Sequence, residues 1–232
     1  MIKILAIVNS FSQDATARME ELCNDVFVRN LFIGGCTLQR HAENIRADAA
    51  AYEYQHNGNN TGDPVSIAWA LNAEDWDYVT VQQASGYSGV AESYEPYLTE
   101  LLNYVRARTK AKIVFHRTWA YEPDSTHPQF ADYGCDTERM WQCIQKASDA
   151  ACRNHGLPVA DSGAMIAALR KYDFFNKKKG GLGLCRDGFH MSVEYGRVAT
   201  ACVWIKFFTG QIPAALSAPD RPVGYEYILR EL

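Results

Sequence analysis

The sequence predicts an α/β fold, a three-layer α/β/α sandwich on a flavodoxin-like, doubly wound sheet of about five mainly parallel strands. Two observations predict it. Short apolar runs rich in β-branched residues alternate with segments whose apolar residues recur at helical spacing. Each apolar run also ends in polar or glycine residues, which suits the open edge of a parallel sheet. Strands separated by helices require crossover connections, and these favour parallel pairing.

Size and composition predict one domain spanning residues 1–232. A chain of 232 residues with 47% hydrophobic composition can build one well-buried core. The net charge is -4 and no long basic run is present, so we expect no nucleic-acid partner. The seven cysteines form no C-x-x-C pair, and we expect reduced, mostly structural thiols.

The first element is expected to be a strand over Ile2–Val8, a continuous apolar run after Lys3. This N-terminus lacks the charged region and cleavage site of a signal peptide. We expect a cytoplasmic location for the chain as given, or a periplasmic or secreted one if a leader was removed. The apolar stretch 198–208 is short and flanked by charges, so no membrane anchor is expected. A helix is expected next, through Ala15, Met19, Leu22 and Val26.

The later elements follow in order along the chain. Further strands are expected at Val26–Phe32, Tyr78–Val81, Ile113–Phe115 and Leu157–Ala160. Helices are expected at Leu38–Ala51, Pro64–Leu71, Tyr94–Arg108, Thr137–Asn154, Gly163–Tyr172 and Ser192–Phe208. Two stretches break the alternation: 52–63 is expected to be a loop or small hairpin, and 121–133 a long irregular connection.

Ser10 lies where the first strand turns into the first helix. A hydroxyl at this position stands at the carboxyl edge of the sheet, near the amide-rich start of a helix, which suits a nucleophile. The alternative is that Ser10 or Ser12 caps the helix, and for Ser12 the cap is the preferred interpretation.

Asp187 and His190 lie three residues apart in a glycine-containing segment before a long helix. A carboxylate and an imidazole this close can meet in a turn, so that the acid holds one ring nitrogen and the other points outward. The alternative is a surface turn with an incidental histidine. Together with Ser10, these residues supply the three groups that an activated serine needs.

Four segments resemble the ordered blocks of the GDSL/SGNH hydrolases: Asn9-Ser10-Phe11-Ser12, Gly34-Gly35-Cys36-Thr37, a polar motif after the third strand, and Asp187-x-x-His190. The segments 76–83, 118–121 and 186–192 are also similar to a bacterial branch of that superfamily that has Gln in place of the third-block Asn. The resemblance implies Ser10 as nucleophile, His190 as general base and then acid, and Asp187 as its orienting partner. It implies no cofactor and no metal.

The resemblance also implies an oxyanion hole from the backbone amides of Ser10 and Gly35, although Gly35 could be a plain turn glycine. Two departures from the family pattern stand out. Val8 replaces the usual glycine of the first block, and the third block reads Gln82-Gln83 with no Asn. Because a glutamine carboxamide has the same donor chemistry, we expect Gln83 to complete the oxyanion hole and Gln82 to contact substrate. The alternative is that one of the two glutamines pairs with the backbone and the other contacts substrate.

Further crevice candidates follow the fourth strand. Arg117, Trp119 and Tyr121 are expected to bind substrate, with His116 beside them, although aromatic residues in such places more often pack in the core. Asp161 is expected to cap a helix.

Three functions remain open at the level of sequence. The first is a serine esterase that removes acetyl or another small acyl group from a carbohydrate or related metabolite through an acyl-enzyme. The second is a metal-dependent hydrolase using Asp14, Asp187 and His190. The third is a flavodoxin-like binding module without enzymatic activity. A small-molecule or glycan ester is the expected partner of the first.

Overall fold

The computed structural model describes residues 1–232 and contains one seven-stranded sheet in the order β4-β3-β2-β1-β5-β6-β7. The five expected strands pair in parallel, which confirms the doubly wound fold. The 52–63 segment is a hairpin, and its two strands add an antiparallel edge. The strands are β1 (Ile2–Val8), β2 (Val26–Phe32), β3 (Glu53–His56), β4 (Asn59–Asn60), β5 (Tyr78–Val81), β6 (Lys112–Arg117) and β7 (Val159–Asp161).

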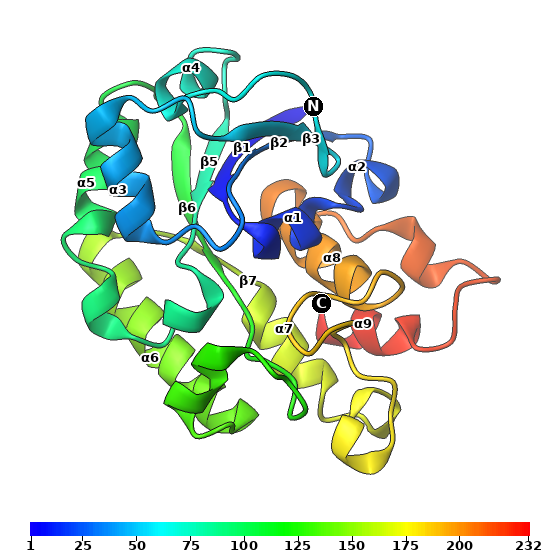
Figure 1. Cartoon of the computed structure of the whole chain (residues 1–232). Helices are drawn as coiled ribbons and strands as arrows, with labels where there is room; N and C mark the ends of the chain where they lie inside the picture. The colour runs from blue at the N-terminus through cyan, green and yellow to red at the C-terminus, as the bar shows by residue number, and fades with distance from the viewer.

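Helices cover both faces of the sheet, as Figure 1 shows with α3, α5 and α6 on one side of the strands and α1 and α8 on the other. The first group is α3 (Leu38–Ala47), α4 (Ile67–Leu71), α5 (Tyr97–Arg106) and α6 (Thr137–His155). The second is α1 (Ser10–Thr16), α2 (Met19–Leu22), α7 (Ser162–Leu169), α8 (Gly196–Thr209) and α9 (Tyr225–Glu231). Short 3₁₀ turns lie in the connections: Ser85–Tyr87, Ala91–Ser93, Pro128–Tyr133, Asp173–Phe175, Lys177–Lys179 and Ala214–Ser217.

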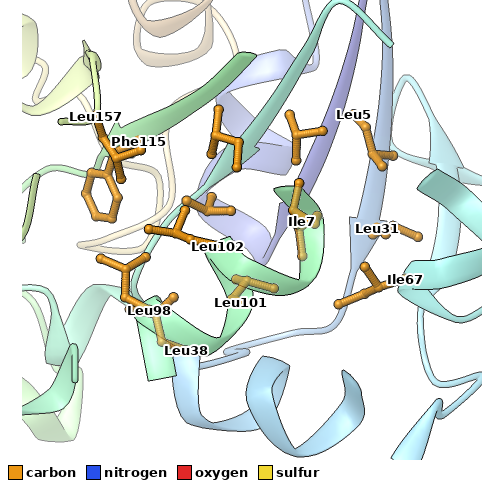
Figure 2. Close-up of a cluster of buried hydrophobic side chains, with 14 of the residues drawn as sticks. Leu5, Ile7, Leu31, Leu38, Ile67, Leu98, Leu101, Leu102, Phe115 and Leu157 are labelled. Atoms are coloured by element: carbon orange, nitrogen blue, oxygen red, sulfur yellow. The ribbon is translucent and has the colours of Figure 1, made fainter. Parts of the chain in front are cut away.

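The central strand is apolar throughout because both of its faces are covered. Leu5 and Ile7 pack under α3, α4 and α5, whereas Ile4, Ala6 and Val8 pack under α1, α2 and α8. Successive side chains of a strand point to opposite faces, so a doubly covered strand has no polar side. Figure 2 shows the first of these clusters, in which Leu5, Ile7 and Leu31 from the strands meet leucines of α5.

Two expectations about the helices are wrong. The first predicted helix is broken at Ala17-Arg18 into α1 and α2, and Val26 belongs to β2. Helix α9, near the C-terminus, is not among the predicted helices, because charged residues interrupt its apolar pattern. In the structure it packs on α7. None of the helices has the combination of length and apolar character that crossing a lipid bilayer requires.

Candidate active site

Ser10 is the first residue of α1, and only Asn9 separates it from the end of β1. Asn9 caps this helix, and its Oδ1 accepts the N–H of Phe11 at 3.1 Å. The Asn9 Nδ2 donates to the carbonyl of Cys36 at 3.0 Å, in the turn that follows β2. Asn9 therefore fixes the Ser10 segment against the Gly34-Gly35 turn.

Asp187 and His190 lie at the tip of a short hairpin that precedes α8. The hairpin is closed by hydrogen bonds from Arg186 N–H to the His190 carbonyl at 2.9 Å and from Ser192 N–H to the Leu184 carbonyl at 2.8 Å. Gly188 has φ +90°, a conformation that residues with a side chain rarely adopt. Within the tip, Asp187 Oδ1 accepts the N–H of Phe189 at 3.1 Å, as in an Asx turn, and also the N–H of His190 at 2.7 Å.

The structure brings Ser10, His190 and Asp187 into one hydrogen-bonded chain. The Ser10 Oγ lies 2.8 Å from His190 Nε2, and His190 Nδ1 lies 2.7 Å from Asp187 Oδ2. Their side chains remain open to solvent, with His190 exposed by 22% and Asp187 by 42%. Ser10 itself is half-buried, so the chain of three groups lies at the surface of the protein and not in its core.

Partial burial acts to raise the pKa of Asp187, but hydrogen bonds from the His190 ring and from the N–H groups of His190 and Phe189 outweigh it. The net effect holds the pKa of Asp187 below its usual value. The carboxylate is therefore ionised at neutral pH. In that state it accepts the Nδ1–H of His190 and leaves Nε2 free to take a proton from Ser10.

Asp14 anchors both ends of the hairpin tip and is itself 1% exposed. Its oxygens accept the N–H of Met191 at 2.8 Å, two contacts from Arg186 at 3.0 and 3.1 Å, and one from the Arg197 Nε at 2.8 Å. Arg186 immediately precedes Asp187, and Met191 immediately follows His190. Because Asp14 is one turn after Ser10 on α1, one helix carries both Ser10 and the anchor of the His190 hairpin.

Two further side chains from the 119–122 loop hold the same hairpin. Trp119 is fully buried, stacks on Phe11 with ring centroids 4.5 Å apart, and donates its Nε1–H to the Phe189 carbonyl at 2.8 Å. Glu122 is 1% exposed and accepts the N–H of Leu184 at 2.8 Å. Its own backbone N–H donates to the Gly188 carbonyl at 2.7 Å.

The two backbone amides expected in the oxyanion hole are available. Ser10 opens α1, where a backbone N–H has no acceptor within the helix. Gly35 lies exposed in the turn after β2 with φ +63°, and its N–H has no backbone acceptor. The Asn9–Cys36 hydrogen bond joins the two segments that carry these amides.

The structure places Gln83 away from the role expected for it. Gln83 is 1% exposed, and its Nε2 donates to the carbonyl and the hydroxyl of Ser93 at 2.9 and 3.0 Å. Its Oε1 accepts the N–H groups of Leu38 at 3.0 Å and Ala84 at 2.8 Å. The carboxamide therefore has no free N–H for an oxyanion, and it instead ties the loop after β5 to α3.

Gln82 is also withdrawn from substrate. It is fully buried, donates to the Asn9 side chain, and contacts Ser12 and His116. Ser12 is not the helix cap, because Asn9 fills that position. The Ser12 hydroxyl instead lies 2.7 Å from His116 Nδ1, and His116 Nε2 lies 2.9 Å from the Ser162 hydroxyl. This buried chain of hydrogen-bonded polar groups joins α1 to β6 and α7.

The three residues expected to bind substrate at the end of β6 and in the loop after it are buried. Arg117 pairs with Asp161 at 2.5 Å and with Asp149. Trp119 packs as described above, and Tyr121 is fully buried with its hydroxyl 2.8 Å from the Ser85 Oγ. Each side chain already has its polar partner inside the protein, so this structure gives all three a supporting role. Asp161 caps α7 through the N–H of Ala164 at 2.9 Å, as expected.

Asp14, Asp187 and His190 do not assemble as metal ligands. The Asp14 carboxylate is taken up by two guanidinium groups and a backbone N–H, while Asp187 and His190 bond to each other. No group of three or more His, Cys, Asp or Glu residues in residues 1–232 has metal-binding geometry.

Sequence reasoning missed the anchoring role of Asp14 and Glu122. The available signal for Asp14 is its place in the sequence, four residues after Ser10 on the same predicted helix face. A carboxylate on a helix face that packs against the protein requires a charged or hydrogen-bonding partner. Glu122 lies in a segment without periodicity, and no comparable signal marks it.

Comparisons with known proteins agree with this fold. A crystal structure of a DUF4886 family protein from Bacteroides uniformis is 35% identical, with TM-score 0.88 over 99% of this chain and 92% of that one. A lipolytic G-D-S-L family member from Veillonella parvula is 12% identical, with TM-score 0.57 over 91% and 100%. A catalytic mutant of an acetylxylan esterase from Geobacillus stearothermophilus is 13% identical, with TM-score 0.52 over 88% and 93%.

None of the curated proteins compared with the chain matches it by sequence. The distant structural likenesses show that the chain shares its fold with a lipolytic G-D-S-L family member and with an acetylxylan esterase. The family model described as a domain of unknown function, DUF4886, matches residues 3–221. With 35% identity to a solved DUF4886 protein over nearly all of its length, the chain belongs to the DUF4886 family.

Proposed function

We propose that the protein is a serine hydrolase of carboxylic esters, with Ser10 as nucleophile, His190 as general base and Asp187 as its orienting acid. The observation that carries the proposal is the chain of two contacts, 2.8 Å from Ser10 Oγ to His190 Nε2 and 2.7 Å from His190 Nδ1 to Asp187 Oδ2. A serine, an imidazole and a carboxylate in this order form an activated nucleophile.

In the proposed reaction, the Ser10 Oγ attacks the ester carbonyl carbon while its proton moves to His190 Nε2. The negatively charged oxygen of the tetrahedral intermediate accepts hydrogen bonds from the backbone N–H groups of Ser10 and Gly35. The ester C–O bond then breaks, and the alcohol leaves with the proton from His190. Water repeats the sequence on the acyl-enzyme, with His190 again as base, and releases the carboxylic acid.

With Gln82 and Gln83 bonded inside the protein, we propose an oxyanion hole of backbone donors alone. Loss of one such donor typically costs about 2.7–4 kcal/mol of transition-state stabilisation. This assignment replaces the side-chain donor that the third block of related hydrolases implies.

For substrate we propose a small acyl group, acetyl first, on a carbohydrate or related metabolite. The acetylxylan esterase among the structural neighbours acts on such an ester and shares this fold. A screen of short-chain acyl esters and acetylated glycans tests the proposal, and a cutoff in chain length measures the room for the acyl group.

The decisive variant is Ser10→Ala. We expect its esterase activity to fall about 10³-fold or more, because the nucleophile is gone. We also expect it to lose covalent labelling by a fluorophosphonate. Ser217→Ala is the matched control, since Ser217 is exposed and lies near the C-terminus of the chain, outside the hydrogen-bonded chain of Ser10. Full esterase activity in purified Ser10→Ala protein would refute the proposal.

A further inference from the structure

Five buried polar side chains form a continuous hydrogen-bonded network beneath the candidate site. They are Asn9, Ser12, Gln82, His116 and Ser162, and none is exposed by more than 1%. His116 lies at the centre, with Nε2 2.9 Å from the Ser162 hydroxyl and Nδ1 2.7 Å from the Ser12 hydroxyl. Gln82 connects these groups to Asn9. Because the network is closed to solvent, it can act on a substrate only through other groups.

Two backbone groups fix the direction of the hydrogen bonds in this network. The N–H of Phe11 can only donate, so the Asn9 atom 3.1 Å from it is the carboxamide oxygen. The Cys36 carbonyl can only accept, so the Asn9 nitrogen is the atom 3.0 Å from it. Since the Asn9 oxygen is an acceptor, Gln82 must turn its Nε2 toward Asn9. The oxygen of Gln82 therefore faces the rest of the network and needs donors there.

The orientation of Gln82 in turn sets the tautomer of His116. The Gln82 Oε1 accepts the hydroxyl proton of Ser12 and lies 3.0 Å from His116 Nδ1, which must therefore carry a proton. Nε2 is then bare and accepts the hydroxyl proton of Ser162. Burial lowers the pKa of His116 to about 3, so the ring stays neutral at neutral pH. One arrangement of protons satisfies these contacts.

The network ends at the two segments that carry the backbone donors of the proposed oxyanion hole. Asn9 caps α1 directly before Ser10, and its Nδ2 bonds the carbonyl of Cys36, the neighbour of Gly35. A carboxamide rotated by half a turn would place the Asn9 oxygen against the Cys36 carbonyl, where two acceptors repel. Gln82 adds a second donor to the Asn9 oxygen and so favours the bonded orientation. The spacing of the two amides therefore depends on how Asn9 is held.

We propose that Gln82 is a positioning residue of the oxyanion hole, which acts through Asn9 on the amides of Ser10 and Gly35. The inference rests on the proposed esterase function. The carboxamide of the third block then stabilises the oxyanion indirectly, because it holds the backbone donors in place and makes no hydrogen bond to the substrate. Donors that are fixed before the reaction need no reorganisation in the transition state.

Hydrolysis of para-nitrophenyl acetate and of its thionoester, in which sulfur replaces the carbonyl oxygen, tests the proposal. Sulfur accepts hydrogen bonds weakly, so the ratio of the two kcat/KM values reports the hydrogen bonds of the oxyanion hole. Gln82→Met keeps the length of the side chain and removes its hydrogen bonds. We expect kcat/KM for the oxygen ester to fall about 10–100-fold and the ratio to fall about tenfold. Loss of stability alone would not change this ratio.

Gln55→Met is the matched control. Gln55 is 2% exposed, accepts from the Gln13 side chain at 2.9 Å and donates to Glu53 at 2.6 Å, and it has no hydrogen bond to Asn9. The same substitution therefore removes buried hydrogen bonds at a site outside the network. We expect lower stability and the wild-type ratio. Urea denaturation shows whether each variant is folded under the assay conditions.

A milder variant and a measurement on the wild type make the test independent of whether Gln82→Met folds. Ser12→Ala removes one donor to Gln82 and should lower the ratio by a smaller factor. Nitrogen NMR of isotope-labelled wild-type protein should show His116 with Nδ1 protonated and Nε2 bare. The opposite tautomer would overturn the inference, because Gln82 Oε1 would then lose its donor from the ring.

The wild-type ratio in folded Gln82→Met protein would overturn the inference, and so would the wild-type ratio in Ser12→Ala if only that variant folds. An equal fall of the ratio in Gln55→Met would also overturn it, because the effect would then not pass through Asn9. A wild-type protein without esterase activity refutes the proposed function and this inference together. Activity that Ser10→Ala abolishes and Gln82→Met leaves intact overturns the inference alone.

Discussion

At the scale of single residues, the candidate site depends on Asp187 remaining ionised. The pKa of Asp187 is held below its usual value despite partial burial, by hydrogen bonds from His190 and Phe189. As the pH falls from neutral, Asp187 therefore stays a carboxylate and keeps its hydrogen bond to the His190 ring. Because a general base must be free of its proton to act, activity that stays constant into acid pH would contradict the assignment.

Asp187→Asn tests the orienting role with little change in shape. The Asn oxygen can still accept the N–H groups of Phe189 and His190, so the turn is kept. The amide cannot hold the imidazole in the tautomer that presents a bare Nε2 to Ser10. We expect kcat to fall about 10³–10⁴-fold.

Steady-state kinetics and circular dichroism check this prediction together, because the variant should remain folded. Asp173→Asn, which removes an exposed carboxylate paired with Lys179, is the control and should keep the wild-type kcat. If kcat of Asp187→Asn falls less than about tenfold, Asp187 does not orient the base.

At the scale of elements, α1 sets the geometry of the site although it has only seven residues. Ser10 begins the helix after the Asn9 cap, and Asp14 follows one turn later on the same face. Asp14 accepts hydrogen bonds from residues on both sides of the hairpin tip. The spacing of one helical turn between Ser10 and Asp14 therefore fixes where His190 lies relative to Ser10. Misplacement of a catalytic group by about 1 Å can cost about 10²-fold in rate.

We therefore expect Asp14→Asn to lower both stability and kcat. The change leaves Arg186 and Arg197 without their carboxylate, and because both keep some access to water we expect a loss of about 2–3 kcal/mol in unfolding free energy. The looser hairpin should lower kcat about 10–100-fold, with KM nearly unchanged. Urea denaturation and steady-state kinetics measure the two effects.

Glu20→Gln separates a positioning role from general destabilisation. Glu20 lies on the neighbouring α2, accepts the N–H of Val28 at 3.0 Å and pairs with His56 at 2.6 Å. Its loss should lower stability without a change in kcat. Equal losses of kcat in the Glu20 and Asp14 variants would show that Asp14 acts only through stability.

At the scale of the whole molecule, the sequence predicted the three layers and the mainly parallel strands, because burial on both faces makes a strand such as Ile2–Val8 apolar along its length. It could not predict which way polar side chains face. Gln82 and Gln83 are adjacent in the third block, and both turn inward to partners from other segments, Asn9 and Ser93. Such partners are set by tertiary packing and leave no local pattern.

Two buried histidines connect the stability of the whole fold to pH. Burial lowers the pKa of His116 and that of His41 from 6.5 to about 3. His116 lies between Ser12 and Ser162, and the His41 ring lies against the hydroxyl of Tyr52. Between these two pKa values the unfolded chain binds protons that the folded chain excludes. The folded state is therefore destabilised as the pH falls below 6.5.

At about pH 5 each histidine should lower the unfolding free energy by about 2 kcal/mol relative to neutral pH. Urea denaturation at about pH 7 and about pH 5 measures the difference, which contains both contributions. His116→Gln and His41→Gln should each reduce the difference in unfolding free energy between the two pH values by about 2 kcal/mol, whatever their effect at either pH alone. A difference that neither variant reduces would show that both rings are protonated within the folded protein.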